Sequence, residues 1–337
     1  MHKGNATPAG TAAYAARFPQ ASANGFYRVA QDLTVSSLGL GTYLGAMDER
    51  TDRGYAESVK KAVRGGVNFL DTSLNYRNQR SERNIGAALK ELLDSAEVRR
   101  EELVVCTKAG YLVPGATPSL GREDVVGGMH CMVPAFLADQ LERSRANLGL
   151  ETIDVLHLHN PETQLEYVAA DEFYSRIEQA FQGLEALAAQ GKLLYYGTAT
   201  WNGYRATGGQ ALALPRLVEI ARKVAGEAHR FRFIQLPLNL GMVEGLGVLE
   251  PAREMGVTAI ASASLLQARL SSNLPEEVRR RLPGAKTDAQ RALQFARSAP
   301  GIAVALAGMS TPGHVEENLG ICAFPPATPE QFQSLFQ

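Results

Sequence analysis

Short apolar runs that alternate with helix-like segments limit the fold of this chain more than any other feature of its sequence. About eight runs rich in Val, Ile and Leu are each followed by a helix-like segment, with roughly 30–40 residues per unit where no loop is enlarged. Continuous apolar strands that alternate with helices indicate a parallel sheet covered by helices. Eight such units fit a closed (β/α)8 barrel, or TIM barrel, better than an open sheet. We expect strands at residues 38–42, 67–70, 103–107, 153–158, 193–197, 231–236, 257–261 and 302–307, and helices at 52–64, 81–93, 134–148, 171–190, 209–225, 244–255, 286–299 and 311–319.

The beginning of the chain precedes the first strand–helix unit. Residues 1–25 are rich in Ala, Gly, Asn and Ser and indicate a flexible N-terminal tail. Residues 26–34 are expected to pair with 35–37 as a short β-hairpin that closes the bottom of the barrel. No low-complexity linker divides the remaining chain. Residues 26–337 are therefore predicted to form a single (β/α)8 barrel domain.

The charge balance and the cysteine count exclude several classes of protein. The 34 Lys and Arg residues and 35 Asp and Glu residues give a net charge of −1, whereas a nucleic-acid-binding protein usually has a basic excess. No stretch approaches the roughly 18 apolar residues that a membrane span requires, and the first residues lack the order of a secretory signal. Cys106, Cys131 and Cys322 are an odd number without the spacing of metal ligands. We expect a cytoplasmic protein without a nucleic-acid partner, a membrane partner or a metal site.

Polar and small residues gather where the predicted strands end. In a parallel barrel, the C-terminal ends of the strands meet on one face, and active sites are built there. Taken alone, each residue has an ordinary explanation, such as a loop carboxylate or a solvated lysine. Their shared placement favours a functional site. The residues at or just after the strand ends are Asp71, Lys108, His157, His159, Thr200, Trp201, Asn202, Gln235, Ser262, Ser264 and Gly308.

Asp71, Tyr76 and Lys108 are considered as one chemical group. A short loop that begins at Asp71 can carry the phenol of Tyr76 over the barrel mouth, and Lys108 arrives from the next strand. A buried ammonium near a phenol favours the phenolate and should lower the tyrosine pKa from its ordinary value of about 10. The aspartate would keep the ammonium charged and oriented. This group suits a proton donor that works near neutral pH.

A set of short segments occurs in a constant order along the predicted barrel. They are Leu40-Gly41-Thr42, the loop from Asp71 to Tyr76 with Ser81-Glu82, Thr107-Lys108, Leu156-His157-Leu158-His159-Asn160-Pro161, Tyr196-Gly197, Ile234-Gln235-Leu236-Pro237-Leu238-Asn239-Leu240 and Val315-Glu316-Glu317-Asn318-Leu319. Together they resemble the aldo-keto reductases, from about residue 38 to residue 319. The resemblance implies a catalytic tetrad of Asp71, Tyr76, Lys108 and His159. His159 is preferred over His157 because it directly precedes Asn160-Pro161, although both histidines share one face of the strand.

The resemblance also implies a reaction and a cofactor. NADP, or else NAD, would exchange a hydride with a small-molecule carbonyl or alcohol, such as an aldehyde, a ketone or a sugar. Tyr76 would be the general acid and base, and His159 would orient the carbonyl. A helix N-terminus near Thr311 suits the phosphates because its free N–H groups favour anions. The residues expected to contact the nucleotide are Gly41, Thr42, Tyr43, Asp71, Asn160, Thr200, Trp201, Gln235, Ser262, Gly308, Ser310, Thr311, His314, Glu317 and Asn318.

Three departures from the family pattern affect the nucleotide site. Thr200 and Trp201 stand where the family usually has Ser-Asn, and Ser262 stands where many members have a tyrosine that stacks on the nicotinamide. Gly308 and His314 occupy positions where members that prefer NADP often carry Lys and Arg. A phosphate without a cationic partner loses its strongest contacts. The choice between NADP and NAD is therefore open.

Two other functions remain as alternatives. The first is a regulatory or redox-sensing barrel that binds the nicotinamide nucleotide with little turnover. The second is an unrelated barrel hydrolase or isomerase, which would need a metal or a carboxylate pair where the sequence offers only Asp71. The pocket walls are expected at residues 110–133, 161–170 and 323–337, and the oligomeric state is left open. A partly apolar pocket is suggested by Leu112, Met129, Met132, Tyr167 and Phe324.

Overall fold

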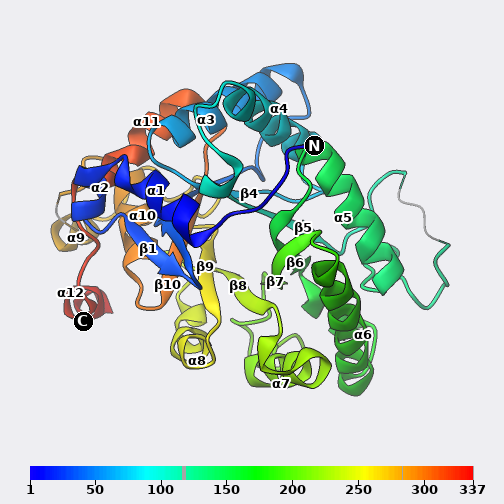
Figure 1. Ribbon diagram of the computed structural model, residues 1–337. Helices are drawn as coiled ribbons and strands as arrows, with labels where there is room; N and C mark the ends of the chain where they lie inside the picture. The colour runs from blue at the N-terminus through cyan, green and yellow to red at the C-terminus, as the bar shows by residue number, and fades with distance from the viewer. Residues whose placement is uncertain (116–118, 283, 337) are drawn as a thin grey trace.

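The structure is a computed structural model that describes residues 1–115, 119–282 and 284–336. Eight parallel strands close into a barrel, and the helices lie around its outside (Figure 1). The barrel strands are β3 (Leu38–Gly41), β4 (Phe69–Asp71), β5 (Val104–Ala109), β6 (Ile153–His159), β7 (Leu193–Ala199), β8 (Phe231–Pro237), β9 (Thr258–Ser262) and β10 (Ile302–Gly308). Neighbouring strands follow the chain order, and β10 pairs with β3 to close the barrel. The predicted (β/α)8 fold is confirmed.

The helices that cover the barrel occupy the predicted segments closely. The helix that follows β3 illustrates why: the Asp48 side chain accepts a hydrogen bond from the N–H of Thr51 at 2.8 Å, and Lys61 and Arg64 lie in the last turn. The covering helices are α3 (Glu49–Arg64), α4 (Arg80–Asp94), α5 (Pro134–Leu148), α6 (Ala170–Ala189), α7 (Leu214–Ala225), α8 (Leu249–Glu254), α10 (Asp288–Ser298) and α11 (Pro312–Leu319).

Four differences from the expected helices have local reasons. α7 begins at Leu214 instead of residue 209, because Pro215 suits the first turn of a helix. The segment predicted as one helix at 244–255 is a 3-10 helix (Glu244–Val248) followed by α8. The sequence does not predict α9 (Glu276–Arg281) and α12 (Pro329–Gln333), which are a short charged helix and a helix near the C-terminus. Among the described residues, no helix is long and apolar enough to cross a membrane.

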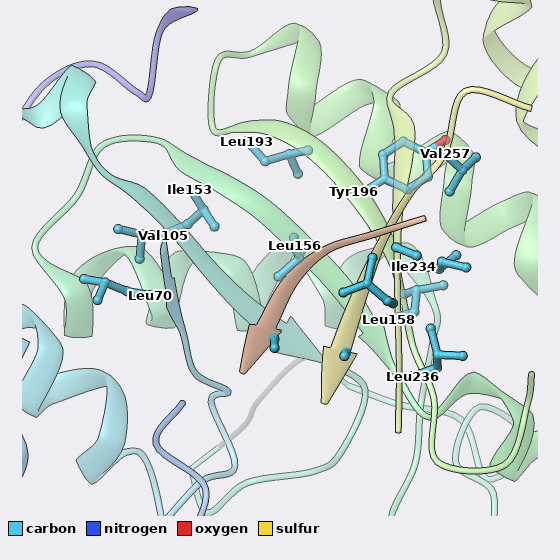
Figure 2. Close-up of a cluster of buried hydrophobic side chains, with 14 of the residues drawn as sticks. Leu70, Val105, Ile153, Leu156, Leu158, Leu193, Tyr196, Ile234, Leu236 and Val257 are labelled. Carbon is cyan, nitrogen blue, oxygen red and sulfur yellow. The ribbon is translucent and has the colours of Figure 1, made fainter. Parts of the chain in front are cut away.

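Successive residues of the barrel strands face opposite sides, as the pleat requires. Leu156 and Leu158 point outward and join the large apolar layer between strands and helices, part of which Figure 2 shows. Val155 belongs instead to a smaller apolar cluster inside the barrel. This inner cluster fills the lower part of the barrel and leaves the upper, C-terminal part to other side chains. Its strand members are Phe69, Val104, Cys106, Val155, Phe233, Ile260, Ala303, Val304 and Leu306.

The predicted hairpin is present and closes the bottom of the barrel. It consists of β1 (Tyr27–Ala30) and β2 (Leu33–Ser36), which pair antiparallel. The chain reverses between Ala30 and Leu33, earlier than expected. Gln31 adopts a left-handed conformation with φ 57° in this turn. Ala30, Leu33 and Val35 pack into the inner apolar cluster, so the hairpin seals the interior from below.

The first residues are packed, in contrast to the expected flexible tail. They contain α1 (Pro8–Ala16) and α2 (Pro19–Ala23). The N–H of Ala6 donates to Oδ1 of Asp154 at 2.7 Å, and the Ala6 side chain joins the inner apolar cluster. The buried Tyr14 hydroxyl contacts the carbonyl of Val63 and lies 3.1 Å from that of Val67. Composition alone misses this packing because its partners are distant in sequence. The domain boundary at residue 26 stays a prediction.

Candidate active site

The C-terminal mouth of the barrel holds a cavity of about 420 Å³. Each of the eight barrel strands contributes at least one residue from its C-terminal end to the lining. Because inward-facing residues alternate along a strand, the residues two positions earlier lie one layer below, and on five strands they belong to the inner apolar cluster. The cavity floor is therefore a ring of residues above the inner cluster. The ring consists of Gly41, Asp71, Lys108, His159, Ala199, Gln235, Ser262 and Gly308.

Asp71 and Lys108 form a buried ion pair in this ring. Nζ of Lys108 lies 2.6 Å from Oδ2 of Asp71 and donates to the carbonyl of Thr72 at 2.8 Å. Nε2 of Gln235 donates to the other carboxylate oxygen at 2.9 Å. Burial opposes the charge on Lys108, but the nearby Asp71 and Tyr76 raise its pKa above the ordinary value. The lysine is thus held as an ammonium.

Tyr76 lies over this ion pair, as the sequence predicts. Its ring centroid is 4.9 Å from Nζ of Lys108, and the Tyr43 ring packs edge-on against it with centroids 5.0 Å apart. The expected lowering of the tyrosine pKa is wrong for this structure. Burial raises the pKa of Tyr76, and the attraction of Lys108 offsets only part of that rise. Tyr76 is therefore a protonated phenol beside a cation.

The structure separates the two histidines of β6. His159 lines the cavity, and its ring centroid is 5.7 Å from that of Tyr76. His157 is fully buried below it, does not line the cavity and pairs in register with Lys108. Burial and the Lys108 charge lower the pKa values of both histidines, to about 3 for His157, so both are neutral. The geometry favours His159 over His157 as the residue that reaches a substrate.

Ser73 contacts His159 and Asn75 contacts Ser73, and neither residue is expected at the site from the sequence. The Ser73 hydroxyl donates to Oδ1 of Asn75 at 2.7 Å, so it is left to accept from Nδ1 of His159 at 3.1 Å. In this arrangement, His159 carries its proton on Nδ1. Rotating the Asn75 amide would reverse both bonds and move the proton to Nε2. No local sequence pattern predicts this series of hydrogen bonds, because it joins the loop after β4 to the end of β6.

The long loop after β5 supports the end of β6 from behind. Nε2 of His130 lies 2.8 Å from the carbonyl of His159, and Nε2 of Gln164 lies 3.2 Å from Nδ1 of His130. The hydroxyl of Tyr111 accepts from Nδ2 of Asn160 at 3.0 Å, and Tyr111 lines the cavity. His130 is therefore a buried support for His159, whereas the sequence places it within an expected pocket wall at residues 110–133.

Ten of the residues expected to contact the nucleotide line the cavity. Thr200 is informative because its Oγ1 is buried without a hydrogen-bond partner, as a group that awaits a polar ligand would be. Oε1 of Glu162 accepts from the backbone N–H groups of Trp201, Asn202 and Gly203 at 2.8, 2.9 and 3.2 Å, and so fixes the loop after β7. The ten are Gly41, Thr42, Tyr43, Asp71, Asn160, Thr200, Trp201, Gln235, Ser262 and Gly308.

The other five expected nucleotide contacts lie beyond the cavity, on the loop after β10 and on α11. The Thr311 side chain caps α11 by accepting from the N–H of His314 at 3.4 Å. The N-terminus of α11 follows directly from Gly308, which lines the cavity. This helix N-terminus favours an anion by its dipole, although Pro312 has no N–H and the N–H of His314 is bonded to Thr311. The five residues are Ser310, Thr311, His314, Glu317 and Asn318.

None of the five residues expected to form a partly apolar pocket lines the cavity. Leu112, Met129 and Tyr167 are exposed on loops outside its lining. Met132 is buried in the outer apolar layer. Phe324 packs beside α10, where Arg297 donates to its backbone carbonyl at 2.7 Å. The C-terminal segment thus covers α10 and does not line the cavity. Within the expected walls, residues 116–118 and 337 lie outside the described part of the chain.

The fold and the site define a (β/α)8-barrel protein with a buried lysine–aspartate ion pair, a tyrosine and a histidine at its C-terminal mouth. The sequence matches the Aldo/keto reductase family over residues 37–337. The chain therefore belongs to this family.

Named relatives and solved structures are similar to the chain over most of its length. A probable voltage-gated potassium channel subunit beta from Arabidopsis thaliana is 25% identical over 85% of this chain and 87% of the relative. L-galactose dehydrogenase from the same plant is 26% identical over 78% of this chain and 76% of the relative. An aldo/keto reductase from Klebsiella pneumoniae, solved with NADP and acetate, has a TM-score of 0.65 at 18% identity, with 91% and 93% of the two chains covered. At this identity, the structural likeness shows the fold alone.

Proposed function

We propose that the protein is an NADP-dependent oxidoreductase that transfers a hydride between the nicotinamide and a carbonyl or alcohol. The observation that carries this proposal is the meeting of Tyr76, the Lys108–Asp71 ion pair and His159 in one cavity. Membership in the Aldo/keto reductase family supports the class of reaction. The NADP found in the Klebsiella pneumoniae structure supports the choice of cofactor.

The cavity residues fit a nicotinamide nucleotide. The unpartnered hydroxyl of Thr200, together with Asn160 and Gln235, would hold the carboxamide, and the N-terminus of α11 would hold phosphates. Gly308 leaves open space, because a Cβ there would meet nothing within 4 Å. When bound, the nucleotide supplies the hydride to the carbonyl carbon or accepts it from the alcohol.

The acid–base work belongs to the side chains of the chain itself. In reduction, the Tyr76 hydroxyl gives its proton to the carbonyl oxygen as that oxygen becomes an alcohol. The Lys108 ammonium stabilises the phenolate left behind, and Asp71 holds the ammonium in place. His159 is neutral, and with the Asn75 amide rotated so that Ser73 donates to Nδ1, its Nε2–H donates the hydrogen bond that orients the carbonyl. In oxidation, the Tyr76 phenolate takes the proton back from the alcohol.

The first test is a fluorescence titration of the protein with NADPH and with NADH, followed by turnover of small aldehydes. We expect tight binding of NADPH and turnover that Tyr76→Phe lowers by roughly 10²- to 10⁴-fold, because a general acid contributes that much. The same variant should bind the nucleotide normally, because it loses the hydroxyl that donates the proton but keeps the aromatic ring. Absence of binding to either nucleotide by the folded protein would contradict the proposal.

A second candidate is a regulatory barrel that binds the nucleotide with little turnover. The relatives named as potassium channel beta subunits favour it. The two candidates differ in one measurement. Nucleotide binding without turnover of any aldehyde or alcohol would support the regulatory barrel, and turnover that depends on Tyr76 would support the oxidoreductase.

A further inference from the structure

Exposed apolar side chains are concentrated around the mouth of the cavity. Ten large hydrophobic side chains are exposed within residues 1–115, 119–282 and 284–336, and seven of them lie on the loops that follow β3, β5, β6 and β7. Solvent-exposed apolar groups normally occur singly, so a concentration at one site indicates a binding surface. We call these seven the apolar rim: Tyr43, Leu44, Met47, Leu112, Met129, Tyr167 and Trp201.

Five of the seven residues of the apolar rim line the cavity or extend its wall. Tyr43, Leu44 and Trp201 line the cavity directly. The N–H of Leu112 donates to the carbonyl of Met129 at 2.8 Å, next to the bridge that Tyr111 makes with His130. Tyr111 itself lines the cavity, so the Leu112–Met129 pair extends the same wall outward. When one end of a ligand reaches Tyr76, the part of the ligand that remains outside the cavity would lie against the apolar rim.

The charged residues of the cavity also favour a ligand without a charge. Asp71 and Lys108 are the charged side chains in its described lining, and they are bonded to each other at 2.6 Å. His159 is neutral, because burial and the Lys108 charge lower its pKa well below the ordinary value. A carboxylate or phosphate on a substrate would leave water and find no free cation in this lining. Burying a charge without a partner is costly.

We propose that the substrate is an uncharged carbonyl compound or alcohol with a sizeable apolar group, aromatic or aliphatic. Its oxygen would face Tyr76 and His159, and its apolar group would lie along the apolar rim. This inference rests on the proposed oxidoreductase function and adds the class of substrate to it. It disfavours free sugars, which have hydroxyl groups on every side, and phosphorylated or carboxylated aldehydes.

Matched aldehydes test the inference. We expect kcat/KM to be about tenfold or more higher for octanal than for propanal, since each added methylene that leaves water contributes favourably. We expect a similar preference for 4-methylbenzaldehyde over 4-carboxybenzaldehyde, which has nearly the same shape and a negative charge. Equal or better turnover of propanal, of 4-carboxybenzaldehyde or of glyceraldehyde would overturn the inference and leave the proposed function in place.

Variants locate the effect on the protein. Leu112→Ser and Met129→Ser should each reduce the ratio of kcat/KM for octanal to that for propanal. Val29→Ser is the matched control, because Val29 is 73% exposed on the hairpin at the other end of the barrel and should leave the ratio unchanged. Light scattering measures the oligomeric state of each variant. If the rim variants change the oligomeric state but not the ratio of kcat/KM for octanal to that for propanal, a second copy of the chain occupies the rim and the inference is wrong. Nucleotide binding without turnover of any of these aldehydes would instead contradict the proposed function.

Discussion

At the scale of single residues, the sequence predicts which side chains reach the cavity better than it predicts their protonation. Asp71, Tyr76, Lys108 and His159 come together as expected, because each lies at or near the C-terminal end of a strand. The pKa of Tyr76 is raised and not lowered, since the burial of the phenol depends on neighbours such as Tyr43. The roles of the Ser73 hydroxyl and the Asn75 amide could not be predicted either, because the contact between Ser73 and His159 joins parts of the chain that are distant in sequence.

The two histidines of β6 provide the first prediction. His159→Ala should lower kcat/KM for carbonyl reduction by roughly 10²-fold or more, as expected for loss of a group that orients the reacting oxygen. His157→Ala should have a much smaller effect on kcat/KM, because His157 does not line the cavity. Steady-state kinetics of both variants, with circular dichroism as the control for folding, decide the matter. The reverse order of effects would assign the role to His157.

The second prediction concerns the proton on His159. In Asn75→Asp, the carboxylate can only accept from Ser73, so the amide rotation that moves the His159 proton to Nε2 is lost. Nδ1 then keeps the proton, and Nε2 cannot donate to a carbonyl. We expect kcat for reduction to fall by about tenfold or more, and the ¹⁵N spectrum of His159 to show an Nδ1–H ring.

Ser73→Ala is the matched variant. It frees His159 from this constraint and should have a smaller effect on kcat than Asn75→Asp. An Nε2–H ring in Asn75→Asp, or an unchanged kcat, would contradict the assignment.

At the scale of elements, strands and covering helices could be predicted because their apolar periodicity is local. α1 and α2 could not, because their alanine-rich and polar sequences resemble a tail until Tyr14 meets the loop after α3. The start of α7 is set by Pro215, a local signal that the apolar periodicity does not report, and the position of the C-terminal segment depends on its packing beside α10. At the site, the loop after β7 is held by the buried carboxylate of Glu162, which lies in the segment after β6 and is distant from that loop in sequence.

The N-terminal helices provide the third prediction. Tyr14→Ala should lower the free energy of unfolding by about 3 kcal/mol, because it removes a fully buried aromatic side chain. Gln20→Ala is the control on the neighbouring helix, since Gln20 is exposed, and it should have little effect. Urea unfolding of the three proteins measures both values. An unaltered stability of Tyr14→Ala would mean that residues 1–25 are the flexible tail that the composition suggests.

At the scale of the whole molecule, burial of neutral histidines links stability to acid. Burial lowers the pKa values of His130 and His229 to about 4 and that of His157 to about 3, whereas unfolded histidine titrates near 6.5. As pH falls from about 6.5 toward 4, the unfolded chain takes up protons that the folded chain does not. The folded state is therefore stabilised above this range and loses stability within it.

The fourth prediction follows from this loss of stability at acid pH. The free energy of unfolding should decrease steadily from pH 6.5 to pH 4.5, with each shifted pKa unit equivalent to about 1.4 kcal/mol. His229→Gln should lose part of this pH dependence. His314→Gln is the control, because His314 is exposed, and it should keep the wild-type slope. Urea titrations at several pH values test it, and a flat profile for the wild-type protein would contradict it.

The seam between β3 and β10 has a consequence for the synthesis of the protein. Leu38 pairs with Ala305, and Gly41 pairs with Gly308, so the first and last strands of the barrel close the ring. On the ribosome, β3 emerges early and keeps an open edge until β10 leaves the exit tunnel. Open strand edges pair readily with other chains. Because the seam also runs through the cavity lining, the cavity is incomplete and one strand edge stays open until β10 has been synthesised.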